Sequence, residues 1–125
     1  MKINRLLTNL CSDNLAASKD FYTRLFDFRV DYDSDWFVHL ISQGRELEIG
    51  IMLADHELIP TQFRGRPMGM YLTLVVDDAM AVFERAKQLK FEVVQDPELT
   101  FYDQRRLLLK DPAGVLVDVS SPENS

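Results

Sequence analysis

Carboxylate, phenol and hydroxyl side chains recur at alternate positions of segments whose sequences are typical of strands. The carboxylates are Glu46, Glu48 and Asp118, while Tyr71 and Thr73 supply a phenol and a hydroxyl. Alternate residues of a strand share one face of a sheet. Carboxylates on such a face can attract a cationic group or accept a proton, and a phenol can donate a hydrogen bond to a developing oxyanion. The spacing therefore predicts a sheet face equipped to bind or transform a small molecule.

Further residues are expected near this face, each with a plainer alternative role. Trp36 can be a core or dimer contact instead, and Phe101 and Tyr102 can either cap a pocket or pack on the second half of the chain. Neighbours on a strand point to opposite sides, so at most one of Arg105 and Arg106 lines the face. The candidate ligand-binding set is Leu7, Asn9, Trp36, His39, Glu46, Glu48, Met52, Tyr71, Thr73, Phe101, Tyr102, Arg105 and Asp118.

The first half of the chain is expected to supply a strand, a helix and three more strands. Residues 3–11 are predicted to form the first strand, and Asn14 can cap a helix with apolar residues at helical spacing through Phe28. The later strands are expected at residues 29–32, 36–41 and 46–53. On the last of these, Leu47, Ile49, Ile51 and Leu53 should face the helix. Both sets of alternate residues in segment 36–41 are apolar, so His39 can lie on either face of the sheet.

The second half repeats this order, which makes the chain a tandem of two βαβββ modules. A strand over residues 70–76 leads to a helix capped by Asp77 or Asp78, and strands follow at 91–95, 104–110 and 115–119. Leu72, Leu74 and Val76 are expected inside, and Asp111 to Gly114 forms a turn. Residues 56–69 hold two prolines and two glycines and are interpreted as a linker within a single domain, 1–125, with modules at 1–55 and 70–125.

Composition excludes several classes of partner. The formal net charge of −6 argues against nucleic-acid binding, and no apolar run is long enough to span a membrane. No secretory leader is visible, so a cytoplasmic location is expected. The single Cys11 cannot form an internal disulfide and is interpreted as a small structural residue.

Three segments carry a family resemblance that covers nearly the whole chain. They are residues 15–22 with Phe26-Asp27-Phe28, the helix start Val76-Asp77-Asp78, and residues 104–114 ending in Asp-Pro-Ala-Gly. In this order they resemble the vicinal oxygen chelate superfamily of glyoxalase I, extradiol dioxygenases, fosfomycin resistance enzymes and bleomycin-binding proteins. The resemblance implies an α+β fold whose two βαβββ modules form a cupped, mostly antiparallel mixed sheet, commonly in a homodimer.

The resemblance also implies where a metal ion would bind in metal-using members. One ligand comes from each of four strands, usually two His and two Glu, and these positions fall on Leu7, Glu48, Tyr71 and Asp118. Leu7 cannot bind a metal, and a neutral phenol is a poor ligand. No cofactor is therefore expected.

The leading hypothesis is a metal-free small-molecule-binding protein, similar to bleomycin-resistance proteins, that holds a cationic or aromatic ligand. One alternative is an enzyme of the same superfamily, a lyase, isomerase or dioxygenase. Such an enzyme uses a metal, or else Glu48 or Asp118 as a general base with a raised pKa and Tyr71 as a hydrogen-bond donor. The other alternative is a protein whose exposed strands only dimerise.

Overall fold

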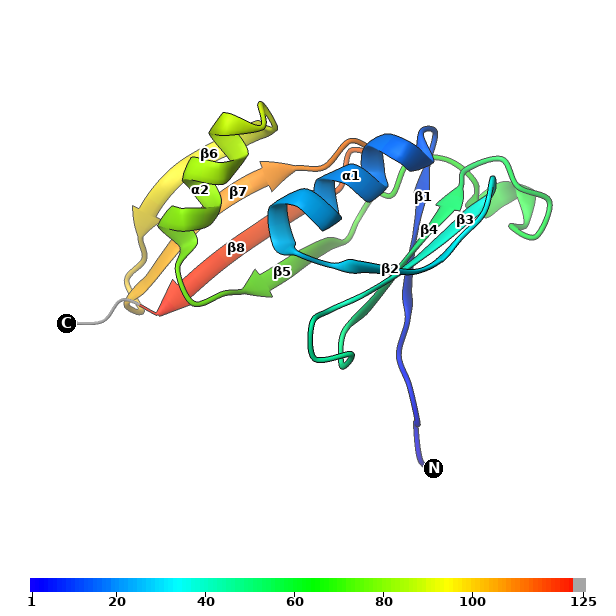
Figure 1. Cartoon of the computed structure of the whole chain (residues 1–125), viewed down its shortest axis with the longest axis horizontal. Helices are drawn as coiled ribbons and strands as arrows, with labels where there is room; N and C mark the ends of the chain where they lie inside the picture. Colours follow the sequence, from blue (N-terminus) through cyan, green and yellow to red (C-terminus); the bar gives the residue numbers. More distant parts are fainter. Residues whose placement is uncertain (123–125) are drawn as a thin grey trace. The chain divides into compact units, whose positions relative to one another are not determined.

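A computed structural model describes residues 1–122 of the chain as two compact units that divide after Pro67. The first unit contains β1 (Thr8–Ser12), α1 (Leu15–Phe26), β2 (Arg29–Asp33), β3 (Phe37–Ile41), β4 (Glu48–Leu53) and a short 3-10 helix η1 (Thr61–Phe63). The second contains β5 (Tyr71–Val75), α2 (Ala79–Gln88), β6 (Glu92–Leu99), β7 (Gln104–Lys110) and β8 (Leu116–Pro122). The predicted βαβββ order is confirmed in both units (Figure 1).

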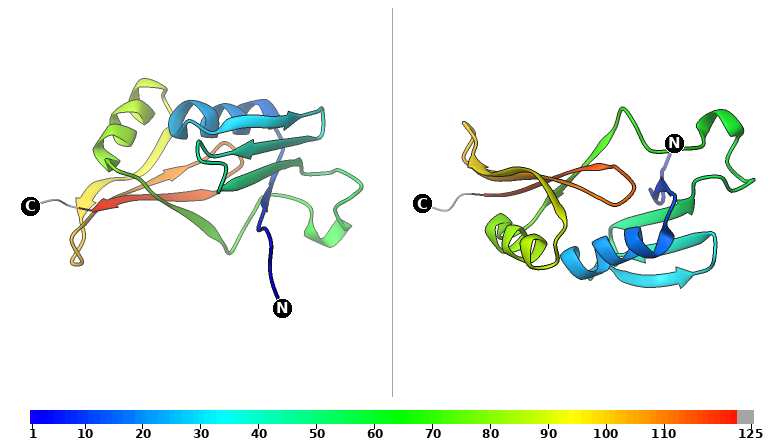
Figure 2. Two further views of the ribbon diagram at one scale, coloured as in Figure 1. Left: turned by 60° about the horizontal axis from the view of Figure 1, so that its bottom comes forward. Right: turned by 90° about the horizontal axis from the view of Figure 1, so that it is seen from above.

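Each unit builds one mixed four-stranded sheet with the same topology. The strand orders are β1-β4-β3-β2 and β5-β8-β7-β6, and in each sheet the first strand runs parallel to the last. Helix α1 lies over β3 and β4, and α2 lies over β6, β7 and β8. Figure 2 shows each helix on one side of its own sheet. We call the opposite side of each sheet the open face of that unit.

Capping side chains fix where the helices begin. The Asn14 side chain accepts a hydrogen bond from the Ala17 backbone N–H at 3.0 Å. Of the two caps predicted for the second helix, Asp78 is the one found, because its Oδ1 accepts from Met80 N at 3.0 Å and from Ala81 N at 3.3 Å. These bonds satisfy backbone donors that the first helical turn leaves without partners.

The core of each unit lies between its helix and its sheet. In the first unit α1 buries Phe21, Tyr22 and Leu25 over the apolar face of the strands. The helix ends at Phe26 because Asp27 adopts a left-handed conformation, so Phe28 lies beyond the helix although its side chain is buried. The buried residues of the second unit are Ala79, Val82, Ala86, Leu107, Leu109, Ala113, Val115, Val117 and Val119, with buried polar positions at Asp111, Asp118, Ser120 and Ser121.

A buried carboxylate closes the turn predicted between the last two strands. The Oδ1 atom of Asp111 accepts hydrogen bonds from the backbone N–H groups of Ala113 at 2.9 Å and Val115 at 2.8 Å. Gly114 adopts a positive φ of 93°, which glycine tolerates without a steric cost. The turn prediction is confirmed.

Two strand predictions in the first unit were too long. Residues 3–7 lie outside β1, which is paired with β4. The first pair between these two strands is Thr8–Ile49, and the chain before Glu48 is a loop. Glu46 and Leu47 belong to the β3–β4 loop, where Leu47 is 60% exposed rather than packed under the helix. The loop is held by its own hydrogen bonds, including Ser42 N to Leu47 O at 2.9 Å.

Two strands of the second unit are longer than predicted. β6 continues through Pro97 to Leu99, where a loop was expected, because it is an edge strand with irregular pairing and an edge tolerates proline. β8 starts at Leu116 and runs to Pro122, which pairs with Gln104. Within residues 1–122, neither helix has the length and hydropathy needed to cross a membrane.

The two adjacent aspartates at the start of α2 offer a matched test of this capping. Asp78→Ala should lower the free energy of unfolding by about 1 kcal/mol, because two helical N–H groups lose their acceptor. Asp77→Ala should change it by less than about 0.5 kcal/mol. Urea denaturation followed by circular dichroism measures both, and equal losses would contradict the assignment of Asp78 as the cap.

Candidate functional site

Strand pairing determines which predicted site residues share the open face of the first unit. Asn9 pairs with Gly50 on β4, and His39 on β3 pairs with the same glycine. Cys11 and Phe37 likewise both pair with Met52. Directly paired residues in neighbouring strands point to the same side of a sheet. His39, whose side was ambiguous from its sequence, therefore lies on the open face beside Glu48.

Charged and titratable side chains, among them Arg5, His39 and Glu48, form a connected network on this face. Arg5 Nε donates to Glu48 Oε2 at 2.6 Å, and Arg5 Nη2 donates to Glu48 Oε1. His39 Nε2 lies 2.8 Å from Glu48 Oε1, and His39 Nδ1 lies 3.1 Å from Asp31 Oδ2. A protonated imidazole can donate to both carboxylates at once, whereas a neutral one can donate to only one. Residue 5 is thus tied to the sheet although it precedes β1.

The network strongly favours the ionised form of Glu48. Hydrogen bonding from Arg5 lowers the pKa of Glu48 to about 2, with a further contribution from His39 and against the opposing effect of burial. The same contact raises the pKa of Arg5. A carboxylate held in this state is a weak general base, because its proton affinity has been reduced rather than raised.

The centre of this face is shaped by a glycine. A Cβ atom added at Gly50 would lie 2.0 Å from Asn9 Oδ1 and 2.9 Å from Phe37 Cε1. The Asn9 amide therefore occupies the space that a side chain at position 50 would need. Cys11 lies next to this amide along β1 and is half-buried, and burial raises the pKa of its thiol. The thiol form agrees with a structural interpretation of Cys11.

The open face of the second unit carries a smaller network. Asp118 on β8 pairs with Thr73 on β5, and Thr73 Oγ1 donates to Asp118 Oδ2 at 3.1 Å. Arg106 Nε donates to Asp118 Oδ1 at 2.9 Å. Both oxygens of this buried carboxylate therefore accept hydrogen bonds from side chains of the same unit.

The structure places Arg106, and not Arg105, on the face that carries Asp118. Arg105 pairs with Ser121, whose hydroxyl accepts from the first backbone N–H of α2 at 2.9 Å, so this pair lies on the helix side. Arg106 pairs with Ser120 on the other side. The expectation that at most one of these arginines lines the open face is confirmed, but the candidate residue changes.

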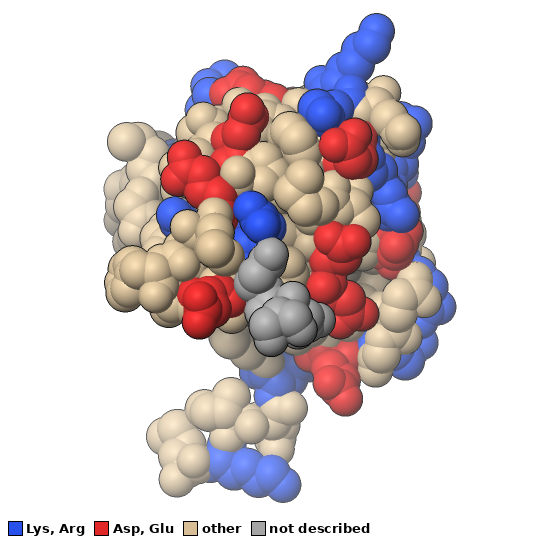
Figure 3. All heavy atoms as spheres, turned by 90° about the vertical axis from the view of Figure 1, so that its left-hand side faces the viewer, with Lys and Arg blue, Asp and Glu red and all other residues tan. Residues whose placement is uncertain are grey.

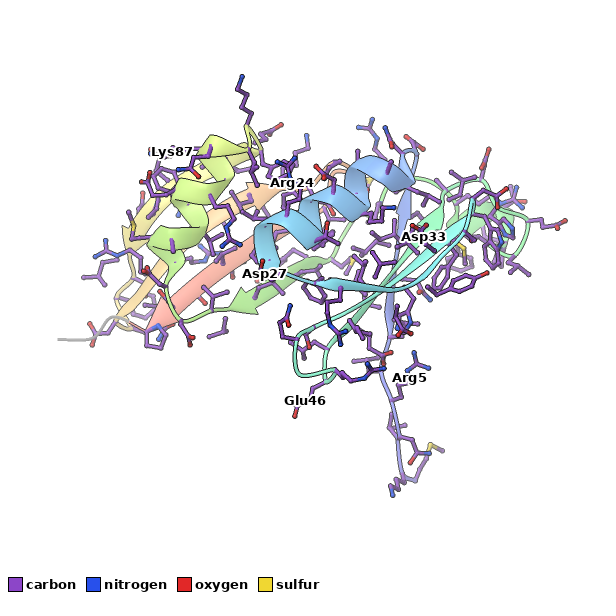
Figure 4. The ribbon with its side chains drawn as sticks, in the orientation of Figure 1. Arg5, Arg24, Asp27, Asp33, Glu46 and Lys87 are labelled. Carbon is purple, nitrogen blue, oxygen red and sulfur yellow. The ribbon has the colours of Figure 1, made fainter. Side chains whose placement is uncertain are left out.

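Other predicted site residues lie apart from these networks. Glu46 is exposed in the β3–β4 loop and points away from the strands in Figure 4. Trp36 stacks on His56, with ring centroids 4.3 Å apart. Phe101 and Tyr102 form an edge-to-face pair, exposed in the β6–β7 loop. Tyr71 is 55% exposed and pairs with Leu116 rather than with Asp118. Leu7 and Met52 are half-buried.

A cavity of about 330 Å³ lies elsewhere in the first unit. It is lined by the start of α1, the end of β2 and the β2–β3 turn, where Lys19 Nζ contacts Asp33 Oδ2 at 2.7 Å. None of the predicted ligand-binding residues lines it. The acidic residues Asp13 and Asp35 in its wall also make it a poor place for an anion.

The pairing register of the strands corrects one of the four metal-ligand positions that the resemblance implied. Counted back from the caps Asn14 and Asp78, Asn9 corresponds to Thr73, and Leu7 to Tyr71. Thr73 pairs with Asp118 and Asn9 pairs with Gly50, so Gly50 takes the place of Asp118 in the first unit. Glu48 corresponds to Leu116 instead.

The corrected set does not suit a metal ion. It comprises Leu7, Gly50, Tyr71 and Asp118, of which only the last offers a carboxylate, and both oxygens of that carboxylate already accept hydrogen bonds. Among residues 1–122, no three His, Cys, Asp or Glu side chains are grouped so that they could hold a metal ion.

Sequence reasoning missed the partners of the carboxylates. No pattern in the sequence links Arg5 to Glu48, because the two residues are 43 positions apart in the chain. Asp31 lies at an irregularity in the pairing of β2 with β3, which alternation does not reveal. The net negative charge also does not describe how charges are distributed on the surface. Acidic and basic side chains are interspersed on the face drawn in Figure 3.

Comparisons with known proteins agree with this fold. Residues 2–119 match the Glyoxalase/Bleomycin resistance protein/Dioxygenase superfamily. The chain belongs to this superfamily. A comparison with curated proteins finds no match.

Solved structures of this fold include proteins with different roles. A lactoylglutathione lyase from Agrobacterium tumefaciens is 18% identical, with a TM-score of 0.71 over 96% of this chain and 94% of the lyase. A bleomycin resistance determinant encoded on transposon Tn5 is also 18% identical, with a TM-score of 0.68 over 98% of this chain and 100% of the determinant. A family enzyme from Burkholderia phytofirmans PsJN is 21% identical, with a TM-score of 0.76 over 92% and 95% of the two chains. The shared fold spans a resistance determinant and enzymes, so the fold alone does not assign a function, and the site residues must be considered.

The close approach of Asn9 to Gly50 predicts a coupled mutational effect. Gly50→Ala should lower the free energy of unfolding by about 1–3 kcal/mol, because the new methyl group collides with the amide. In an Asn9→Ala background, Gly50→Ala should lower the free energy of unfolding by a smaller amount. Gly44→Ala is the control, since none of residues 1–122 apart from its two chain neighbours has an atom within 4 Å of a Cβ at that position. An equal cost of Gly50→Ala in both backgrounds, measured by urea denaturation, would rule out this contact.

The lowered pKa of Glu48 predicts a contribution to acid sensitivity. Its pKa is about 2 in the folded chain against an ordinary 4.5, so the unfolded chain binds more protons between these values. The stability supplied by Glu48 should be fully present above about pH 5 and lost as the pH falls toward 2. Glu48→Gln should flatten the dependence of unfolding free energy on pH in this window, and Glu46→Gln should leave it as in the wild type. If the unfolding free energy of Glu48→Gln depended on pH in the same way as that of the wild type, the assigned contacts of Glu48 would be contradicted.

Proposed function

We propose that this chain is a small-molecule-binding member of the superfamily that works without a bound metal ion. The observation that carries the proposal is the state of Asp118, which is engaged by Arg106 and Thr73 while Gly50 replaces the corresponding carboxylate in the first unit. A metal ion would compete with the positively charged Arg106 for Asp118 and would gain few protein ligands in return.

The same observations favour binding over acid–base catalysis. Glu48 has a lowered pKa, which is the opposite of what a general base at neutral pH requires. Both oxygens of Asp118 already accept hydrogen bonds, one from Thr73 and one from Arg106, so a substrate would compete with these donors. Tyr71, the expected oxyanion donor, is mostly exposed and is not paired with Asp118.

The open faces nevertheless combine apolar and polar groups in the way that small-molecule sites do. Phe37 and Met52 pair across β3 and β4, next to the Asn9 amide. In the second unit Leu108 pairs with Asp118. The bleomycin resistance determinant that shares this fold supports a ligand-holding role. Homodimer formation and a cytoplasmic location remain predictions from the resemblance and the sequence.

The cationic ligand expected from the acidic residues is not part of this proposal. Glu48 is matched by Arg5, and Asp118 is matched by Arg106. A cationic group would find each carboxylate already neutralised. The aromatic or apolar part of the expected ligand is retained.

Metal content and ligand binding are measured together to test the proposal. Purified protein is incubated with Zn²⁺, Ni²⁺, Mn²⁺ or anaerobic Fe²⁺, desalted, and analysed by elemental mass spectrometry. We expect substoichiometric metal that does not change in Asp118→Ala. A thermal-shift screen of aromatic compounds should identify ligands that raise the melting temperature without added metal.

Two outcomes would overturn the proposal. Near-stoichiometric retention of one metal that Asp118→Ala abolishes would show that the carboxylate leaves Arg106 to bind the ion. Turnover of a bound compound, detected by chromatography of the incubated mixture, would establish an enzyme. Asp55→Ala, at an exposed position outside both networks, serves as the matched control for both measurements.

A further inference from the structure

In both open-face networks the arginine is more exposed than the carboxylate it neutralises. The Arg106 side chain is 28% exposed and that of Asp118 only 11%. Arg5 is 58% exposed over Glu48 at 11%. Within each of these pairs, a ligand that approaches the face therefore meets the guanidinium before it meets the carboxylate that the guanidinium neutralises.

We propose that Arg106 binds a carboxylate group of the ligand, with Asp118 and Thr73 as positioning residues. This inference rests on the proposed function and names the chemical class of ligand that the second unit recognises. The ligand is an organic acid with an apolar body, because Leu108 lies on the same face and pairs directly with Asp118.

The hydrogen-bonding capacity of Arg106 supports this assignment. A guanidinium has five N–H donors, and Arg106 uses only its Nε–H, toward Asp118. Within residues 1–122, no acceptor is bonded to its two Nη groups. These groups form a planar fork that matches the two oxygens of a carboxylate.

Asp118 and Thr73 hold this fork in place. Asp118 is buried in a central strand, and the Thr73 hydroxyl fixes its second oxygen, so the guanidinium has one anchored edge. A pre-positioned arginine loses less side-chain freedom when a ligand binds. The buried carboxylate thus orients a cationic donor instead of acting as the binding group.

One acidic residue opposes the proposal and provides a test of it. Glu98 on β6 pairs in register with Arg106, yet forms no ion pair with it in the described part of the chain. A carboxylate ligand beside Glu98 would feel its negative charge. Glu98→Gln should therefore tighten binding of an organic acid about twofold or more by removing this repulsion.

The experiment compares three naphthalene probes that differ only in their polar group. They are 1-naphthoate, its neutral amide 1-naphthamide, and the cation 1-naphthylmethylammonium. The full chain, labelled with ¹⁵N, is titrated with each, and the arginine Nε–Hε signals are followed by NMR. We expect naphthoate to bind about tenfold more tightly than the amide and to shift the Arg106 signal, since charge-assisted hydrogen bonds contribute on this scale.

Variants separate recognition from folding. Arg106→Gln alone would leave Asp118 buried without its partner, so the double variant Arg106→Gln/Asp118→Asn is used instead. It should lower naphthoate affinity about tenfold, to that of the amide, while amide affinity stays the same. Arg105→Gln, on the same strand but on the helix side, should change naphthoate affinity less than about twofold.

Each result decides between distinct conclusions. Equal binding of naphthoate and the amide, an unshifted Arg106 signal, or unchanged naphthoate affinity in the double variant would overturn the carboxylate assignment. Binding of the amide or the cation in these cases would leave metal-free small-molecule binding intact. No saturable binding of naphthoate up to millimolar concentration would also overturn the assignment, and the metal and thermal-shift measurements would then decide the proposed function separately.

Discussion

Parallel pairing of the first and last strand in each unit is the constraint on which the candidate site depends. It sets Asn9 against Gly50 in one sheet and Thr73 against Asp118 in the other. A shift of one residue would send these side chains to the helix side, because strand neighbours alternate between faces. The helix covering the opposite side of each sheet makes such a shift costly, since it would bring polar groups into the apolar core. Core and site are thus specified by the same register.

Burial then determines the charge state of the open faces. A carboxylate in a central strand cannot remain unpaired without a large desolvation cost, and each unit supplies an arginine in answer. Arg5 comes from the segment before β1, and Arg106 comes from the neighbouring strand β7. The two units thus contain the same kind of ion pair, although a different segment supplies the arginine in each unit. The formal net charge of −6 does not describe the charge at either site, because the arginine is the more exposed partner in each pair.

The sequence was sufficient for features that depend on local periodicity. Alternation placed Thr73 and Asp118 together on one face, and the apolar spacing located both helices. It failed where the answer depends on a partner strand. Residues 3–7 have a strand-like sequence but pair with no strand among residues 1–122, and β6 passes through Pro97 because an edge strand tolerates proline. The choice of Arg106 over Arg105, and of Gly50 over Glu48, required the register between strands, which a single sequence does not contain.

Duplication explains how the two open faces could diverge while the fold stayed the same. Each unit closes its own core between one helix and one sheet, so a substitution on an open face does not disturb the apolar contacts on the other side. Gly50 and Asp118 occupy corresponding places, yet one leaves room for an amide and the other orients an arginine. Asp118 accepts hydrogen bonds from Arg106 and from Thr73, so this buried carboxylate acts on the open face by orienting the arginine.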